Sequence, residues 1–414
     1  MAGYPIPDTA TWDGVTGREW TAHGTGLVRY EYRAGWTVEY ATRNPGVGWN
    51  AFTDYSAYLM GFHVHRKVDD WYLGPAADNG TLSFDDSDGA HRCPAGGRLR
   101  LSVTVPSGTF VLFDGMVIDQ MYELTAGVFP TVSVIVTNWF GYEARTTTSR
   151  TSDTTETTGE ALARTIDSGS WGPRDLTRWD DGVTQMIPEG VYNVPDQLSR
   201  LVRGDLGMLW VTREGEWAYR AKSWWNDDRV TAAAAIGDSG PPDAYDYLFP
   251  LESTVPVTSL NDTINEATWF TPSATLDSIT EWDSDSFLAI HQRSYSDTVW
   301  DAADTDAEDG VWRLVNLYAT PAQRISSVTY PADLSSDAME YSARAEITDF
   351  VNVAMESLEG YWSEWLRCHV LGVRHDWNPH TGWTVTLDVI TGLYEDWESW
   401  ILDTSTLGVE TIPG

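Results

Sequence analysis

Apolar and polar residues alternate along the first third of the chain, where no helical period of comparable length occurs. The runs alternate or stay apolar and β-branched, and clusters of Gly, Pro and Asp separate them. The clearest are WTVEYATRN (36–44), RLRLSVTVP (98–106), TFVLFDGMVIDQMYEL (109–124) and TVSVIVTNWF (131–140). This pattern predicts an N-terminal β-domain over residues 1–145, folded as a barrel or a sandwich.

The pattern then changes abruptly. Residues 146–158, TTTSRTSDTTETT, are polar and lack a period, which predicts a linker or an exposed loop. GEALARTIDSG (159–169) follows as a short helix, because Leu162 and Ile166 lie four residues apart on one face. We expect residues 159–252 to form a small α+β helix–hairpin domain that ends in a long surface excursion.

Within that domain, residues 194–222 indicate an amphipathic helix that runs directly into a tight β-hairpin. Asn193 can cap the helix, and Gly207 is expected to end it. The apolar stripe of the helix comprises Leu198, Leu201, Val202 and Leu206. Glu214-Gly215 then supplies the turn between two short strands.

This hairpin carries no nucleophile, no metal-ligand spacing and no phosphate loop. Its aromatic side chains are Trp210, Trp217 and Tyr219, and aromatic residues dominate both cores and subunit interfaces. We therefore expect the hairpin to brace the space between two β-domains, to pack these three side chains against neighbouring elements or subunits, and to bind no ligand.

The remainder of the chain, residues 253–400, is again rich in strand signals and has one clear helix at 304–318. That helix has acids in its first turn, where the helix dipole favours them, and Pro321 follows its end. Its apolar stripe comprises Val311, Leu314, Val315 and Tyr318. The later strands are QRISSVTY (323–330), EITDFVNVAM (346–355), RCHVLGVRHDW (367–377) and GWTVTLDVITG (382–392). We expect a second barrel-like domain here, and a C-terminal tail over 401–414.

The predicted fold is therefore mainly β with α+β insertions, two barrel-like β-domains being bridged by the helix–hairpin domain. Residues 113–139 and 368–392 share a pattern of a strand with an early Gly, a polar turn and a long alternating strand. If the two segments are related, the chain contains a duplicated β-domain. Three such subunits could form a ring with six similar positions.

The charge of the chain is strongly acidic. It holds 61 Asp and Glu against 26 Lys and Arg, a net charge of −35, and its only lysines are Lys67 and Lys222. Such a surface repels phosphate backbones, which disfavours a nucleic-acid grip. Two readings stay open: a heavily solvated surface, as in a salt-adapted protein, or an acidic conduit that nucleic acid passes without sticking.

Several groups are candidates for redox or metal chemistry, and none matches a known spacing. Cys93 and Cys368 are too few for a disulfide framework and are expected to be buried thiols, although one bridge stays open. The candidates for a zinc site, His63 and His65 with His91 and Cys93, match no closed zinc motif. The stretch that holds Cys368, His369, His375 and His380 is expected to be structural. We expect no bound metal or cofactor.

Acid pairs such as Asp180-Asp181 and Asp283 with Asp285 are frequent, as expected by chance in so acidic a chain. Glycoside cleavage needs two carboxylates at a defined separation, and nothing in the sequence selects one pair. No nucleophile elbow, phosphate loop or zinc-protease motif occurs. The N-terminus lacks the pattern of a signal peptide, and no run is long enough to span a membrane. We expect a soluble, non-enzymatic protein.

The order of parts resembles the hub or minor tail proteins of long-tailed viruses, especially those of actinobacterial phages. The middle block is the most similar: ALARTIDSGSW followed by NVPDQLSRLVRGDLGMLWVTREGEWAYRAK. CPAGGRLRLSV, FVLFDGMVIDQM, SLNDTINEATW, DGVWRLVNLYATP with QRISSVTY, and VLGVRHDWNPHTGWTVTLDV also resemble segments of that family. One departure is Thr348, since relatives usually have a glycine before the aspartate of EITDFVNVA.

The resemblance implies a virion protein of the tail tip, made in the host cytoplasm. Such hubs form a trimeric ring below the distal tail protein, seat the central fibre or other tip proteins, and guide DNA as a transient cargo. Two alternatives remain: a secreted or salt-adapted protein that binds or cleaves carbohydrate, and a receptor-binding tail protein. In the latter, loops 223–247 and 281–306, rich in Trp and Asp, would contact the host.

Overall fold

The computed structural model is mainly β with a few helices, which confirms the predicted fold class. It describes residues 34–391 except the following short segments. These are 45–47, 71–73, 87–92, 124–129, 143–145, 170–171, 223–231, 238–244, 250–252, 258–262, 272–277, 302, 320–323 and 357–362. Among the residues it describes, no helix has the length and apolarity needed to cross a bilayer.

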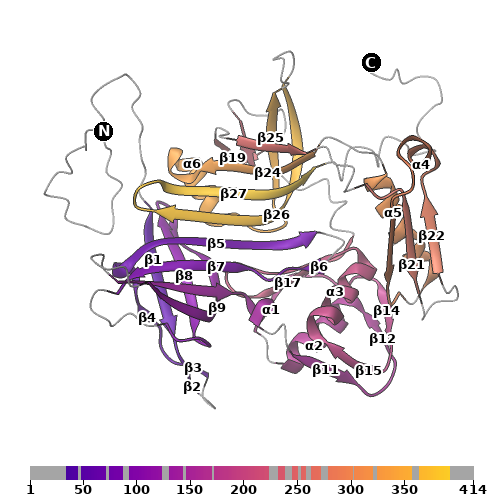
Figure 1. Ribbon diagram of the computed structural model, residues 1–414, viewed down its shortest axis with the longest axis horizontal. Coiled ribbons are helices and arrows are strands. Elements are labelled where there is room, and N and C mark those ends of the chain that lie inside the picture. Colours follow the sequence, from indigo (N-terminus) through magenta and orange to yellow (C-terminus); the bar gives the residue numbers. More distant parts are fainter. Residues whose placement is uncertain are drawn as a thin grey trace, which may run out of the picture.

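One large sheet runs through both ends of the chain (Figure 1). In order, its strands are β19 (Tyr245–Phe249), β18 (Ala232–Ile236), β25 (Phe350–Glu356), β26 (Ser363–Asn378), β5 (Leu59–Asp70), β7 (Asn79–Asp85), β10 (Thr131–Thr137), β9 (Gly108–Glu123), β8 (Arg98–Val105), β1 (Gly35–Ala41) and β4 (Thr53–Asp54). From β26 the sheet also continues through β27 (Gly382–Thr391) to β24 (Arg324–Pro331) and β20 (Ser253–Val257), and β6 (Gly74–Pro75) pairs with β5.

The seam between the two halves of this sheet is the antiparallel pair β5–β26. Its register runs from Phe62 opposite Trp377 to Lys67 opposite Gly372. A single hydrophobic core lies beneath both halves, so Val64 and Leu82 belong to the same cluster as residues of β24, β26 and β27. The ring of Trp36 contacts both Phe62, at 4.8 Å, and Trp383, at 5.1 Å. The two halves are thus joined by backbone pairing and by shared aromatic packing.

The predicted helix–hairpin is confirmed as α3 (Val194–Asp205), β16 (Met208–Val211) and β17 (Trp217–Arg220). The prediction for the end of the helix was wrong by one residue: Leu206, with φ 48°, takes the left-handed position. Gly207 is instead required for close packing, because a Cβ atom there would lie 2.6 Å from the carbonyl oxygen of Arg220. Asn193 precedes the helix without a side-chain capping bond.

The polar segment 146–158, expected to be a linker or loop, contains two strands. β11 (Thr147–Arg150) pairs with β15 (Gly190–Asn193), and β12 (Thr154–Thr157) pairs with β14 (Thr184–Ile187). Threonine is β-branched and favours extended backbone, so a polar segment rich in threonine can form strands. The helix expected next is present as α2 (Thr158–Gly169), and Leu162 and Ile166 are both buried.

Residues 264–319 form a separate three-stranded sheet with two helices, at the right of Figure 1. Its elements are β21 (Glu266–Phe270), β22 (Ser278–Trp282), α4 (Ser284–Ile290), β23 (Ser294–Thr298) and α5 (Asp304–Tyr318). The helix predicted at 304–318 is confirmed as α5. Strands β18 and β19 fall in the segment expected to belong to the helix–hairpin domain, yet they pair in the large sheet beside β25.

The remaining elements are short. They are β2 (Arg43–Asn44), β3 (Gly48–Trp49), η1 (Ser56–Tyr58), α1 (Trp139–Tyr142), β13 (Arg174–Trp179) and η3 (Ala332–Leu334). Helix α6 (Ser336–Arg344), packed against β8, β9 and β19, was not predicted from the sequence. It begins after Ser335, whose hydroxyl accepts a hydrogen bond from the Ala338 amide at 3.0 Å.

Candidate functional site: a polar sheet face over a buried ionic junction

One side of the large sheet carries small polar and charged side chains that line up from strand to strand. Cross-strand partners share a face of a sheet, so the register defines the rows. One row comprises Asp119, Ile135, Thr81, His63, Asp376 and Thr384, and the next comprises Asn79, His65, Arg374, Thr386 and Thr329. We call these two rows, with Asp388 and Lys67 beside them, the polar face. It crosses the β5–β26 seam, where β5, β26 and β27 lie side by side (Figure 1).

Contacts between histidine and aspartate side chains hold the polar face together across the seam. His63 Nδ1 lies 2.5 Å from Asp376 Oδ1, and His65 Nε2 lies 2.6 Å from Asp388 Oδ2. Arg374 Nε contacts the second oxygen of Asp376 at 3.0 Å. Burial by itself would raise the pKa of Asp376, but His63 and Arg374 hold it below its usual range. Each of these side chains therefore already has a partner: Asp376 and Asp388 contact histidines of β5, and Arg374 contacts Asp376 on its own strand.

The zinc candidates of the sequence do not converge. His63 and His65 face the same side of β5, as predicted, but each contacts a carboxylate, and Cys93 is buried in the core. His91 lies outside the described residues. Within the described parts of the chain, no three His, Cys, Asp or Glu side chains come together in a way that could hold a metal ion.

The cysteines are buried free thiols, as expected. Burial raises the pKa of Cys93 to about 12 and raises that of Cys368 further, which disfavours thiolate chemistry at both. His369 and His375 are each 1% exposed, and burial lowers the pKa of His375 to about 3. These groups form part of the core, and His380 lies exposed in the β26–β27 turn.

On the inner side of β5, beneath the polar face, lies a buried ionic junction. Arg66 is 1% exposed; its Nη1 contacts Glu346 Oε1 at 2.5 Å and its Nη2 donates to the carbonyl oxygen of Ala345 at 3.0 Å. Arg178 on β13 lies 3.8 Å from the other carboxylate oxygen of Glu346, and the Arg213 amide of the β16–β17 turn donates to it at 3.3 Å. Both halves of the sheet and the helix–hairpin region thus meet at one carboxylate.

The electrostatics of the junction follow from this burial. Burial would raise the pKa of Glu346, but Arg66, Arg178 and Arg213 together lower it below its usual range, so its charge is retained. For Asp78, by contrast, burial wins and raises the pKa to about 7, although the Lys67 amide donates to it at 2.8 Å. Arg66 was not predicted from the sequence. The available signal was a charged residue at an inward position of the alternating run FHVHRKV.

The hairpin β16–β17 is buried on both of its faces. Trp210, 1% exposed, packs with Met208 and Ala218 into a cluster shared with residues 264–319. Trp217 and Tyr219, 1% and 0% exposed, point the other way into a cluster with α2 and α3. The contacts of all three aromatic side chains are therefore with neighbouring elements of the same chain.

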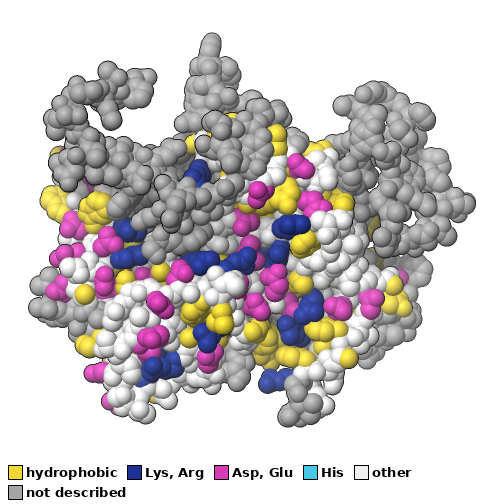
Figure 2. Space-filling model, turned by 180° about the vertical axis from the view of Figure 1, so that it is seen from behind, with side chains coloured by type: hydrophobic (Ala, Val, Ile, Leu, Met, Phe, Trp, Pro, Cys, Tyr) yellow, Lys and Arg dark blue, Asp and Glu magenta, His cyan; other side chains and the backbone are white. Residues whose placement is uncertain are grey.

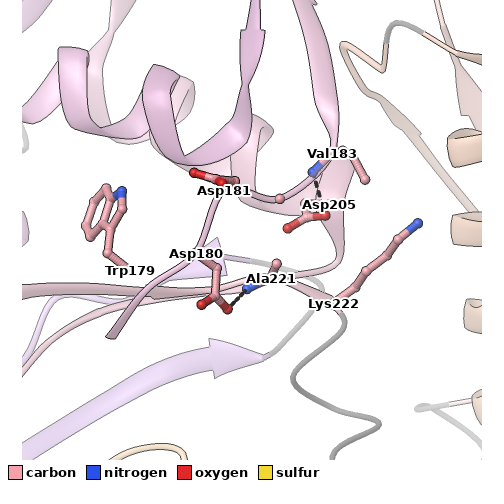
Figure 3. Close-up of a pocket in the computed structure, with 8 residues that line it drawn as sticks. Trp179, Asp180, Asp181, Val183, Asp205, Ala221 and Lys222 are labelled. Carbon is pink, nitrogen blue, oxygen red and sulfur yellow. Dashed lines mark hydrogen bonds between the residues drawn. The ribbon is translucent and has the colours of Figure 1, made fainter. Parts of the chain in front are cut away.

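An open cavity of about 570 Å³ lies beside this hairpin (Figure 3). Its lining comprises Trp179, Asp180, Asp181, Gly182, Val183, Asp205, Ala221 and Lys222. Asp180 pairs with Arg220 at 3.0 Å and accepts the Ala221 amide at 2.9 Å. Asp205 accepts the Val183 amide at 3.2 Å and a bond from the hydroxyl of Tyr219; burial raises its pKa to about 6. The carboxyl groups of Asp180 and Asp205 are therefore both hydrogen-bonded to groups of the surrounding protein.

The chain shares its fold with tail proteins of known structure. A tail protein from Neisseria meningitidis MC58 has a TM-score of 0.56 at 11% identity, over 86% of this chain and 97% of that chain. The 43 kDa tail protein of prophage MuSo2 from Shewanella oneidensis has a TM-score of 0.51 at 12% identity, over 86% and 98%. No protein-family model and no curated protein sequence matches the chain.

Proposed function

We propose that this chain is a structural hub of a virion tail tip, in which three copies form a ring around a channel. The observation that carries the proposal is the shared fold, which extends over 97% of one tail protein and 98% of another. The resemblance of the sequence to tail hub proteins points the same way. In this proposal the protein is not an enzyme, and it joins the distal tail protein to the central fibre or other tip proteins.

The polar face is the surface that we assign to the channel wall. Its side chains are mostly small, polar or charged, and its backbone pairing is continuous across the seam. The three aspartates of this face outnumber its Lys67 and Arg374, and the chain as a whole has a net charge of −35, so such a wall would present no basic groove to hold the phosphates of DNA in transit.

The ring is tested by the mass and shape of the purified full-length protein. Light scattering after gel filtration should give three times the mass of one chain, and electron micrographs should show a threefold ring with a central channel. In intact particles, antibody labelling should place the protein at the tail tip. A monomer at all concentrations together with absence from virions would refute the proposal.

A receptor-binding tail protein is the second candidate, because part of the segment 281–306, which was expected to be a loop but contains α4 and β23, is exposed and apolar. Trp282 is 60% exposed and Leu288 80% exposed, and the ring of Trp282 contacts that of Phe287 at 6.1 Å. The isolated protein should then bind host cells or a glycan array, and Trp282→Ala should reduce that binding at least tenfold. Turnover of a polysaccharide would instead favour the carbohydrate-cleaving alternative.

A further inference from the structure

A carboxyl group without a hydrogen-bond donor lies where residues 264–319 meet the helix–hairpin region. Asp301 is 0% exposed, and its backbone forms an isolated antiparallel bridge with Gln185 of β14. Neither carboxyl oxygen of Asp301 has a partner among the described residues, and neither does the Oε1 atom of Gln185. The backbone of Gly204 on α3 closes the site, since a Cβ atom there would lie 2.7 Å from Asp301 Oδ1.

Around this carboxyl group, the contact between residues 264–319 and the helix–hairpin region is well packed. The Met186 amide donates to the carbonyl oxygen of Trp300 at 2.7 Å. The ring of Trp300 contacts that of Tyr192 at 5.2 Å and lies under the guanidinium of Arg200 at 5.7 Å. The neighbours of Asp301 along the chain are therefore well packed, while its side chain forms no hydrogen bond with any residue that the structure describes.

Two ion pairs flank the same contact between residues 264–319 and the helix–hairpin region. Arg203 of α3 lies 2.6 Å from Asp297 at the end of β23, and Lys222 lies 2.8 Å from Asp309 of α5. Both of these pairs are partly exposed, so each contributes modestly to docking. The fully buried Asp301 lies between them in sequence, and its ionisation state has a larger effect, because an unpaired charge in such a place is very costly.

The charged groups that act on Asp301 come from α3, from α5 and from Lys222, which follows β17. Burial raises its pKa well above the usual range, Asp306 of α5 raises it further, Lys222 lowers it, and Asp205 of α3 raises it again. The folded protein therefore binds a proton that the unfolded chain would release. Stability from this group is complete at low pH and is lost as pH rises from the unfolded pKa through the folded one.

We propose that a proton on Asp301 controls the docking of residues 264–319 against α3 and β14. The neutral carboxyl group stays buried in this contact. Loss of the proton as pH rises leaves a bare charge between Gln185 and Gly204, and the segment 299–301 moves out to reach water. Acid thus tightens this contact and base loosens it, independently of whether the protein assembles into a ring.

Hydrogen exchange of the full-length protein tests this proposal. The probe is the exchange of the 183–187 segment, whose Met186 amide bonds to Trp300. The variant Asp301→Asn is isosteric and cannot ionise, and comparing it with the wild type at each pH cancels the intrinsic exchange rate. Between the ordinary pKa of a carboxyl group, which Asp301 has once the contact opens, and its higher pKa in the folded protein, we expect the protection of the wild type to fall relative to the variant by up to about tenfold per pH unit, with no such trend at lower pH.

Gly204→Ala is the matched control, because it crowds Asp301 without changing a titrating group. It should lower protection at every pH and leave the wild-type slope unchanged. Equal pH profiles for the wild type and Asp301→Asn would overturn the proposal. Protection that instead depends on added sodium or calcium ions would also overturn it, since Asp301 would then be holding a cation.

Discussion

Thr348 is a β-branched residue in the left-handed region, with φ 83°. It lies in the turn between α6 and β25, where the tail hub proteins that the sequence resembles are expected to have glycine. Its amide donates to the carbonyl oxygen of Val370 at 2.9 Å, and the Asp349 amide donates to that of Glu346 at 3.1 Å. The turn is therefore held by its neighbours in spite of an unfavourable residue, and the strand predicted from residue 346 begins only at Phe350.

Replacing Thr348 with glycine should stabilise the protein. A β-branched side chain in this conformation destabilises the folded state by about 1–2 kcal/mol. Glycine removes this strain, but its greater conformational freedom in the unfolded chain offsets part of the gain. We expect Thr348→Gly to raise the free energy of unfolding in urea by about 1 kcal/mol. Thr348→Ala, which keeps a Cβ atom, should gain less. A loss of stability in the glycine variant would contradict this account of the turn.

Trp217 should contribute strongly to stability from inside the hairpin. It is 1% exposed in the cluster with α2 and α3, so Trp217→Ala should lower the free energy of unfolding by about 3–5 kcal/mol. Trp282→Ala, at a position 60% exposed, should change it by less than about 1 kcal/mol. Chemical denaturation of both variants measures the difference, and similar losses would argue against a bracing role for the hairpin.

Among the secondary-structure elements, the sequence predicted the strands and helices whose apolar residues recur with a clear period. The alternating strands and the amphipathic helices α2, α3 and α5 were predictable because one face of each is buried. Helix α6 was not predicted, because all of residues 338–343 are buried, the polar Glu340 and Ser342 included, so the polarity of its side chains does not follow their burial. The end of α3 was also missed, because the role of Gly207 depends on close contact with β17, which local sequence does not reveal.

The buried ionic junction ties three elements together, and it should fail when one charge is removed. Glu346→Gln leaves Arg66 buried without its counter-charge, so we expect the free energy of unfolding to fall by about 3–5 kcal/mol at neutral pH. The double variant Arg66→Met with Glu346→Leu should lose less than Glu346→Gln alone. Urea unfolding measures both, and a double variant that loses more would refute the expected coupling.

The same junction predicts a pH dependence. The pKa of Glu346 is lowered in the folded protein, so its stabilising effect is present above the unfolded pKa and is lost as pH falls through the folded one. In acid, the difference in stability between the wild type and Glu346→Gln should therefore shrink. A difference that stays constant from neutral pH into strong acid would show that the carboxylate charge contributes nothing.

At the scale of the whole molecule, periodicity said which residues face inward but could not say which strands pair. The pairing of β5 with β26 joins residues such as His63 and Asp376, which are 313 positions apart. Nothing local encodes that neighbour, and for this reason the polar face was not visible in the sequence. Arg374, Asp376 and Asp388 acquire their meaning only after β26 and β27 are placed beside β5.

Assembled particles can test the assignment of the polar face. Asp119 is an exposed acid at one end of a row of that face. If the face lines the channel, Asp119→Lys should slow genome ejection, because added positive charge attracts DNA phosphates. Asp285→Lys, at an exposed position on α4, should leave the rate unchanged. Equal ejection rates in both variants and the wild type would count against the assignment.

The long-range pairing of β5 also determines the order in which the chain can mature during synthesis. At about 5–20 residues per second, roughly 15–60 s pass between the emergence of β5 and that of β26 from the ribosome. Throughout that interval, one edge of β5 has open backbone donors and acceptors beside Phe62 and Val64, which belong to a core not yet complete. The nascent chain is thus most prone to aggregate before its last hairpin is made, and truncation before residue 363 should yield insoluble protein.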